Sequence, residues 1–200
     1  MAAHIDYYFS LNSPWTYLGS ARFTEMVRLH GATVAVLPVD FGQVFAQSGG
    51  LPLAKRAPQR QAYRLVELQR WRDHLGLPLN VRPKFFPAND NLAARLVIAA
   101  REAGYDAMSL AHAILRALWA EERDIADADT LREILRVRGL EPAPLFAAAD
   151  TDKIKALLQA GTDKAIAVQV FGAPSYVLDG VIFWGQDRLE FLDRALTRRD

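Results

Sequence analysis

Strand patterns occur only near the two ends of this chain of 200 residues. Between them, from Phe41 to Gln169, apolar residues recur at helical spacing and we find no convincing strand. A helical domain inserted into a small α/β domain would have this pattern. The sequence therefore predicts an α/β unit made of residues 1–40 and 170–200, with an all-helical insertion at residues 41–169.

The first unit has the pattern strand, helix, strand. Apolar side chains alternate with others over residues 5–10, which is the period of a strand. A helix then begins at Ser13, with Pro14 at its first position, and ends near Gly31, a candidate left-handed cap. Residues 33–37 form a second apolar strand, so we expect a right-handed parallel crossover.

The last 30 residues or so predict a hairpin followed by a helix. Two apolar segments, 175–178 and 181–184, flank the turn pair Asp179-Gly180, which is a strong hairpin pattern. A closing helix is expected at about 187–198.

The insertion contains several helices. We expect them near residues 59–75, 90–103, 107–122, 130–138 and 151–169, with stops at Gly76, Gly104 and Gly139 and caps at Asp90, Asp106, Asp129 and Asp150.

Charge and composition favour a small-molecule partner. The 24 Lys and Arg nearly balance the 23 Asp and Glu, so the net balance indicates neither a nucleic-acid groove nor a basic membrane patch. No apolar segment approaches the roughly 20 residues needed to cross a bilayer, and the first residues have no signal-peptide pattern. We therefore expect a cytoplasmic protein.

The chain has no cysteine, which excludes disulfide formation and dithiol exchange. The histidines show no metal-ligand spacing, and without thiolates there is no soft site. We expect no metal site.

Ser13 is the first candidate functional residue. A serine at a helix N-terminus offers a hydroxyl and free backbone N–H groups to an anion, and the helix dipole adds positive charge. Ordinary capping explains the same residue equally simply. A role as nucleophile is disfavoured, because the surrounding residues lack the glycines of a hydrolase elbow and no paired histidine is evident.

The segment around Ala173-Pro174 enters the hairpin. A proline here marks either an edge strand or a cis bond, and a cis bond would leave the Ala173 backbone groups free to pair with an extended peptide ligand. Beyond the hairpin, Gln186 and Asp187 could hold a ligand's ammonium, although a capping Asp beside a surface arginine is an alternative.

These residues resemble a known family: 2-hydroxychromene-2-carboxylate isomerase, within the DsbA-like and kappa-class glutathione transferase group of the thioredoxin fold. The resemblance covers nearly the whole chain. Its most specific blocks are Asp6-Tyr7-Tyr8-Phe9, Ser13-Pro14-Trp15-Thr16-Tyr17-Leu18, Val170-Phe171-Gly172-Ala173-Pro174 and Trp184-Gly185-Gln186-Asp187-Arg188-Leu189.

The resemblance implies that glutathione is a cofactor whose thiolate lies near the catalytic Ser13 hydroxyl. The thiolate is expected to add reversibly to a conjugated substrate, which then rotates about the new single bond. A small aromatic carboxylate substrate and a homodimer are also implied. The residues implied for glutathione binding are Ser13, Ala173, Pro174, Trp184, Gln186 and Asp187.

The substrate side departs from the family pattern. Where relatives often have Gly-Asn before a proline, this chain has Gly49-Gly50, and an expected lysine is Phe45. Lys55 and Arg56 are candidates for the missing polar contacts to a carboxylate or phenol, with a solvated basic face as the alternative. Asn89 matches a position near the substrate cleft.

Three functions remain open at this point. The first is a glutathione-dependent isomerase acting on 2-hydroxychromene-2-carboxylate or a close analogue. The second is a kappa-like glutathione transferase, which a stable adduct would distinguish. The third is a glutathione or peptide binding module with little turnover.

Overall fold

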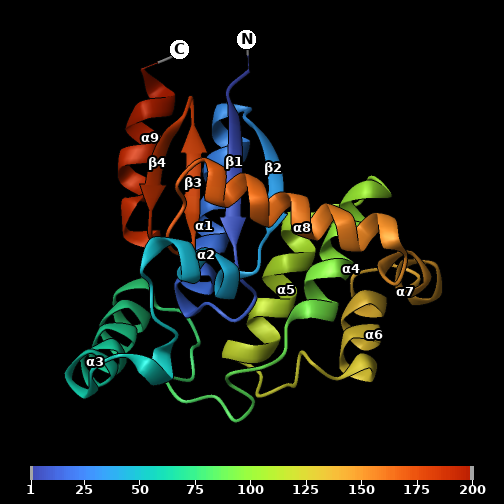
Figure 1. Cartoon of the computed structure of the whole chain (residues 1–200), viewed down its shortest axis with the longest axis horizontal. Coiled ribbons are helices and arrows are strands. Elements are labelled where there is room, and N and C mark those ends of the chain that lie inside the picture. Colours follow the sequence, from blue (N-terminus) through green and yellow to red (C-terminus); the bar gives the residue numbers. More distant parts are fainter. Residues whose placement is uncertain (1, 199–200) are drawn as a thin grey trace.

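The computed structural model describes residues 2–198 and contains a four-stranded sheet (Figure 1). The strands β1 (His4–Phe9), β2 (Thr33–Pro38), β3 (Ser175–Leu178) and β4 (Val181–Trp184) lie in the order β2-β1-β3-β4. β1 pairs in parallel with β2 and antiparallel with β3, and β3 pairs antiparallel with β4. The predicted parallel pairing and the predicted hairpin are both confirmed.

Helices supply most of the remaining structure. They are α1 (Pro14–His30), α2 (Phe41–Ser48), α3 (Pro58–Leu75), α4 (Asn91–Glu102), α5 (Ala107–Trp119), α6 (Ala128–Val137), α7 (Pro142–Ala149), α8 (Asp152–Ala167) and α9 (Leu189–Thr197), with 3₁₀ turns η1 (Leu53–Lys55) and η2 (Gln186–Arg188). Helices α2 to α8 all fall between β2 and β3, so the α/β fold with a large helical insertion is as predicted.

The alternation of β1 divides the core between two faces of the sheet. The Tyr7 ring lies 4.8 Å from the Phe23 ring of α1, between ring centroids, and both belong to the larger core cluster. Tyr8 points to the opposite face, where it packs in a second cluster with Val44 of α2 and Ala165 of α8. One strand therefore supports α1 on one face and the helices α2 and α8 of the insertion on the other.

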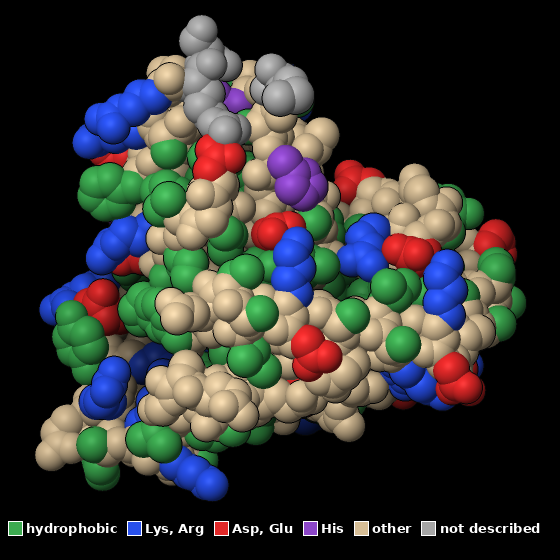
Figure 2. Space-filling model, turned by 45° about the horizontal axis from the view of Figure 1, so that its top comes forward, with side chains coloured by type: hydrophobic (Ala, Val, Ile, Leu, Met, Phe, Trp, Pro, Cys, Tyr) green, Lys and Arg blue, Asp and Glu red, His purple; other side chains and the backbone are tan. Residues whose placement is uncertain are grey.

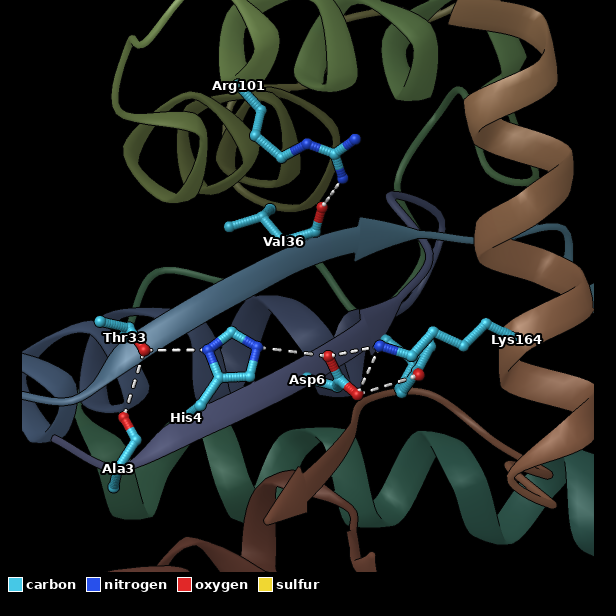
Figure 3. A network of polar contacts seen from close by, with 8 residues as sticks. Ala3, His4, Asp6, Thr33, Val36, Arg101 and Lys164 are labelled. Atoms are coloured by element: carbon cyan, nitrogen blue, oxygen red, sulfur yellow. Dashed lines mark hydrogen bonds and ion pairs between the residues drawn. The ribbon is translucent and has the colours of Figure 1, made fainter. Parts of the chain in front are cut away.

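Polar contacts also attach the insertion to the sheet, as Figure 3 shows. Lys164 of α8 donates to the Asp6 carboxylate of β1 at 2.9 Å, and Arg101 of α4 donates to the backbone carbonyl of Val36 in β2 at 2.8 Å. These contacts hold α4 and α8 against the two strands whose ends form the site described below.

Several predicted helix ends were wrong. α6 is capped by Asp127, which accepts from the Thr130 N–H at 2.8 Å, and Asp129 lies inside the first turn. α8 is capped by Thr151, while Asp150 ends the preceding helix. In each case two candidate caps lie close together in the sequence, and the backbone path selects one of them.

Other differences concern Asp90 and short elements. Asp90 stands at the start of α4 but makes no side-chain cap, because its carboxylate is bound elsewhere. The predicted helix 107–122 already ends at Trp119, and the closing helix begins at Leu189 after η2. The eight-residue helices α2 and α7 were not predicted, since two turns give little periodicity.

Within residues 2–198, no helix is both long enough and apolar enough to cross a membrane. On the face shown in Figure 2, Lys and Arg side chains are interspersed with Asp and Glu side chains. That view therefore shows no extended surface of one charge.

Candidate functional site

Ser13 lies where β1 leads into α1. Its backbone is extended, with φ −87° and ψ 119°, and its hydroxyl oxygen accepts from the Thr16 N–H at 3.2 Å, so it is the helix cap. The same oxygen lies 3.5 Å from the Ala173 carbonyl oxygen, at the outer limit of a hydrogen bond. In this contact the hydroxyl donates, and because the bond is long, a ligand anion could take its place as acceptor.

Ala173 faces Ser13 from the segment that enters β3. The Ala173–Pro174 peptide bond is cis, which the sequence alone left undecided. No residue in the described part of the chain accepts from the Ala173 N–H, whereas the Pro174 carbonyl accepts from the Gly185 N–H at 2.9 Å. An extended ligand could therefore pair with Ala173 as a further strand.

Close packing fixes the backbone beside Ala173. A Cβ atom on Gly172 would stand 2.3 Å from the Trp184 indole nitrogen, so a larger residue here would displace the Trp184 ring. The Trp184 ring is half exposed and lies 4.8 Å from the Phe171 ring, between centroids. Trp184 thus forms one apolar wall beside the free Ala173 N–H.

Gln186 and Asp187 lie in η2, next to the start of α1. Gln186 is 2% exposed, and Arg22 donates to both its backbone carbonyl at 3.0 Å and its side-chain oxygen. With that oxygen occupied, the Gln186 amide N–H groups remain as donors. The Asp187 carboxylate pairs with Arg188 at 2.7 Å and makes no helix cap, so the capping alternative does not hold.

Arg22 is a site residue that sequence analysis missed. It lies on α1 and is separated from Gln186 by 164 positions. Burial lowers the pKa of its guanidinium, and its Nε atom is buried without a partner among the described residues. No motif in the sequence identifies it, because the contact depends entirely on the packing of α1 against η2.

A cleft of about 1670 Å³ joins these groups to the insertion. Of the predicted site residues, the structure brings together Ser13, Phe45, Arg56, Asn89, Ala173, Trp184, Gln186 and Asp187 along its walls. Pro174 is buried behind the wall, and Lys55 is exposed on η1 outside the lining. Lys55 is therefore the one predicted substrate residue that the fold turns away from the cleft.

The remaining predicted substrate residues are engaged in local contacts. The Phe45 ring lies 5.8 Å from the Phe41 ring and fills the space where a Cβ on Gly50 would stand. Arg56 donates through Nε to the Leu51 carbonyl at 2.8 Å, which leaves its terminal nitrogens for other acceptors.

The loop before α4 is attached to the residue preceding Ser13. Asn12 donates to the Ala88 carbonyl at 2.6 Å and accepts from the Ala88 N–H at 2.9 Å. The Asp90 carboxylate accepts from Ser10 at 3.0 Å and from the Asn12 N–H at 3.2 Å, and burial raises its pKa. The loop also contains a cis Phe86–Pro87 bond, which was not predicted.

No group of three or more His, Asp or Glu side chains that could hold a metal ion occurs within the described residues. The site instead offers a hydroxyl, unpaired backbone donors, amide donors and a carboxylate. This set of groups can bind an amino-acid-like ligand that also carries an anion, because each polar end of such a ligand has a complementary group.

Comparison with known proteins identifies the class. A model of the DSBA-like thioredoxin domain matches residues 4–197, and the chain belongs to this family. Its similarity extends to 2-hydroxychromene-2-carboxylate isomerase of Pseudomonas putida, at 29% identity over 97% of this chain and 94% of the relative. A solved structure of 2-hydroxychromene-2-carboxylate isomerase has a TM-score of 0.82 at 26% identity, covering 98% of this chain and 95% of the other.

A further relative is glutathione S-transferase kappa 1 of Caenorhabditis elegans, at 24% identity over 97% of this chain and 91% of that protein. The resemblance inferred from the sequence motifs is thus confirmed: the chain is similar both to these isomerases and to kappa-class transferases.

Proposed function

We propose that the protein is a glutathione-dependent isomerase that interconverts 2-hydroxychromene-2-carboxylate and trans-o-hydroxybenzylidenepyruvate, or a close aromatic analogue. The observation that carries the proposal is the Ser13 hydroxyl, which lies at a helix N-terminus and opposite Ala173 in a chain without cysteine. A thiolate held there has to come from a ligand. The similarity to isomerases over nearly the full length supports the same assignment.

The described residues fit glutathione at both ends. The free Ala173 N–H and its carbonyl suit the cysteinyl backbone, while Asp187 suits the γ-glutamyl ammonium and the Gln186 amide suits its carboxylate. When bound, glutathione supplies the thiolate that adds reversibly to the conjugated double bond and leaves after rotation.

In this mechanism Ser13 is a hydrogen-bond donor. Its proton is not used by the helix, and the N-terminus of α1 adds positive potential, so both favour a thiolate over a thiol. Phe45 and Trp184 contribute apolar rings to the cleft wall.

The kappa relative supports a second candidate, a transferase that conjugates glutathione to an electrophile. The two differ in product, because a transferase keeps the carbon–sulfur bond that an isomerase breaks. A homodimer stays a prediction from the resemblance, and a cytoplasmic location stays a prediction from the sequence pattern.

The test is to mix the protein with the chromene or with its benzylidenepyruvate isomer, with and without glutathione, and to follow absorbance and product mass. We expect interconversion that requires glutathione and leaves no adduct. Accumulation of a glutathione adduct would favour the transferase. Glutathione binding without turnover of either compound would favour the binding module.

A further inference from the structure

Arg64 is a charged residue in the cleft wall that none of the functions above requires. It lies on α3, four residues after Arg60 and eight after Arg56, and all three line the cleft. Arg60 and Arg64 lie one turn apart on the same side of the helix, and Arg56 lies just before the helix begins. The Arg64 guanidinium carbon lies 5.1 Å from the Phe86 ring centroid and 5.6 Å from the Trp119 ring.

Arg64 has no counter-charge within residues 2–198: no ion pair or hydrogen bond joins its guanidinium to a carboxylate. Four acidic residues of this range line the same cleft, Asp40, Glu67, Asp90 and Asp187, and each of their carboxylates is bound to another group. Glu67 pairs with Arg70 at 2.7 Å, and Asp90 accepts from Ser10 at 3.0 Å. Partly burying a cation without an anion is unfavourable, and burial together with Arg56 lowers the pKa of Arg64 to about 10.

The position on the helix adds to this excess of positive charge. Arg60 and Arg64 lie in the first two turns of α3, where the helix dipole is positive and favours anions over cations. The aromatic contacts offset part of the cost, because rings attract cations. They leave the edge of the guanidinium, with its hydrogen-bond donors, without a protein acceptor in the described chain.

The Phe86 ring connects Arg64 to the reaction site. The loop that carries Phe86 continues to Ala88, which exchanges two hydrogen bonds with Asn12, the residue before Ser13. Arg64 therefore contacts a loop that is itself hydrogen-bonded to the residue before Ser13. An anion bound by Arg64 would have a defined position relative to the Ser13 hydroxyl.

We propose that Arg64 is the substrate-binding residue that receives the carboxylate of a planar conjugated substrate, with Arg56 as a second cation. This inference rests on the proposed function and sharpens it. Planar bidentate binding suits a carboxylate and an arginine, and the Arg64 guanidinium packs over the Phe86 and Trp119 rings. The site then selects anionic conjugated substrates over neutral electrophiles of the same shape. Because the proposed isomerase substrate is a carboxylate, this selection favours the isomerase over a transferase that acts on neutral compounds.

The test measures binding of trans-cinnamate, a planar aromatic carboxylate, and of neutral trans-cinnamamide, without glutathione, by tryptophan fluorescence. Arg64→Met keeps most of the apolar length of the side chain but removes the charge. We expect it to weaken cinnamate binding about tenfold or more, as loss of a charged hydrogen-bond pair does, with little change for cinnamamide. The affinity of Arg64→Lys for cinnamate should lie between the affinities of the wild type and of Arg64→Met.

Arg72→Met is the matched control, because Arg72 lies on the same helix, is paired with Asp73, and neither residue is part of the cleft lining. It should leave both affinities unchanged. If Arg64→Met fails to fold, Arg56→Gln carries the test and should also weaken cinnamate binding selectively.

Equal affinities of the wild type for cinnamate and cinnamamide, or an equal loss of both in Arg64→Met, would overturn the proposal and leave Arg64 a packing residue. If Arg64→Met loses affinity for glutathione and keeps its affinity for cinnamate, Arg64 binds a glutathione carboxylate instead of a substrate carboxylate. Because the probes are measured without glutathione, failure of the isomerase assay would not alter this result.

Discussion

The Ser13 hydroxyl oxygen lies 3.5 Å from the carbonyl oxygen of Ala173, which follows it by 160 positions in the chain. The antiparallel pairing of β1 with β3, in which Tyr8 stands opposite Ser175, produces this approach. One strand leads into the helix that Ser13 caps, and the other begins just after the free backbone N–H. The sheet register therefore assembles the proposed thiolate site.

Replacing Ser13 by Ala removes the donor that the bound thiolate is proposed to use. We expect the thiol pKa of bound glutathione to rise by about one unit or more, since a hydrogen bond to a charged group is lost. Isomerisation at neutral pH should slow accordingly. Ultraviolet absorbance of the thiolate, titrated against pH in the complex, measures the shift.

Thr151→Ala provides the control for the capping role. Thr151 caps α8 through its hydroxyl and does not line the cleft, so both variants should lose about 1 kcal/mol of unfolding free energy. Only the Ser13 variant should change the thiolate titration. Identical titration and full turnover in both variants would reduce Ser13 to a helix cap.

Asp187→Ala tests the acceptor for the γ-glutamyl ammonium. The Asp187 carboxylate is exposed and pairs only with the neighbouring Arg188 among the described residues, so its loss should cost less than about 1 kcal/mol of stability. Glutathione affinity, measured by calorimetry, should fall about tenfold. Arg188→Gln, which leaves the carboxylate in place, should retain affinity. A stability loss at constant affinity would contradict the assignment.

Arg22→Met tests whether Arg22 positions Gln186. Without the donor to the Gln186 side-chain oxygen, the amide can turn and no longer presents its N–H groups in one orientation. We expect glutathione affinity to fall about tenfold, while affinity for cysteinylglycine, which lacks the γ-glutamyl group, stays the same. Equal losses for both thiols would show a general disturbance of the fold.

His112 predicts a pH dependence of stability. Burial, together with the positive charges of Arg116 and Arg138, lowers the pKa of His112 below its ordinary value of 6.5, and its ring bonds to the Ser20 hydroxyl at 2.7 Å. The unfolded chain therefore binds this proton at higher pH than the folded chain does. Stability from His112 is complete above about pH 6.5 and is lost as the pH falls toward the folded pKa.

Urea unfolding at several pH values measures this effect. The His112→Gln variant, which keeps a hydrogen-bonding group, should show a flatter decline of unfolding free energy below about pH 6.5. His74→Gln, on the exposed surface of α3, serves as the control and should follow the wild type. An unchanged decline in the His112 variant would assign the pH dependence to other groups.

The insertion shows which helices can be predicted from sequence periodicity. The long helix α3 was predicted to within one residue at its start and at its end, because 18 residues give several turns of pattern and Gly76 supplies a left-handed stop. The helices α2 and α7, with eight residues each, were missed because two helical turns show too little periodicity. For α6, Asp129 was predicted as the cap, whereas the structure uses Asp127 two positions earlier.

The sequence by itself determined the α/β ends, the helical insertion, the absence of any protein thiol, and the motifs that indicated the family. Such features depend on neighbouring residues or on composition, so they can be inferred without coordinates. Only the tertiary structure decided that Ala173–Pro174 is cis, that Lys55 lies outside the cleft, and that Arg22 reaches Gln186. Contacts of that kind join residues far apart in the chain and depend on how whole helices pack, which no local pattern encodes.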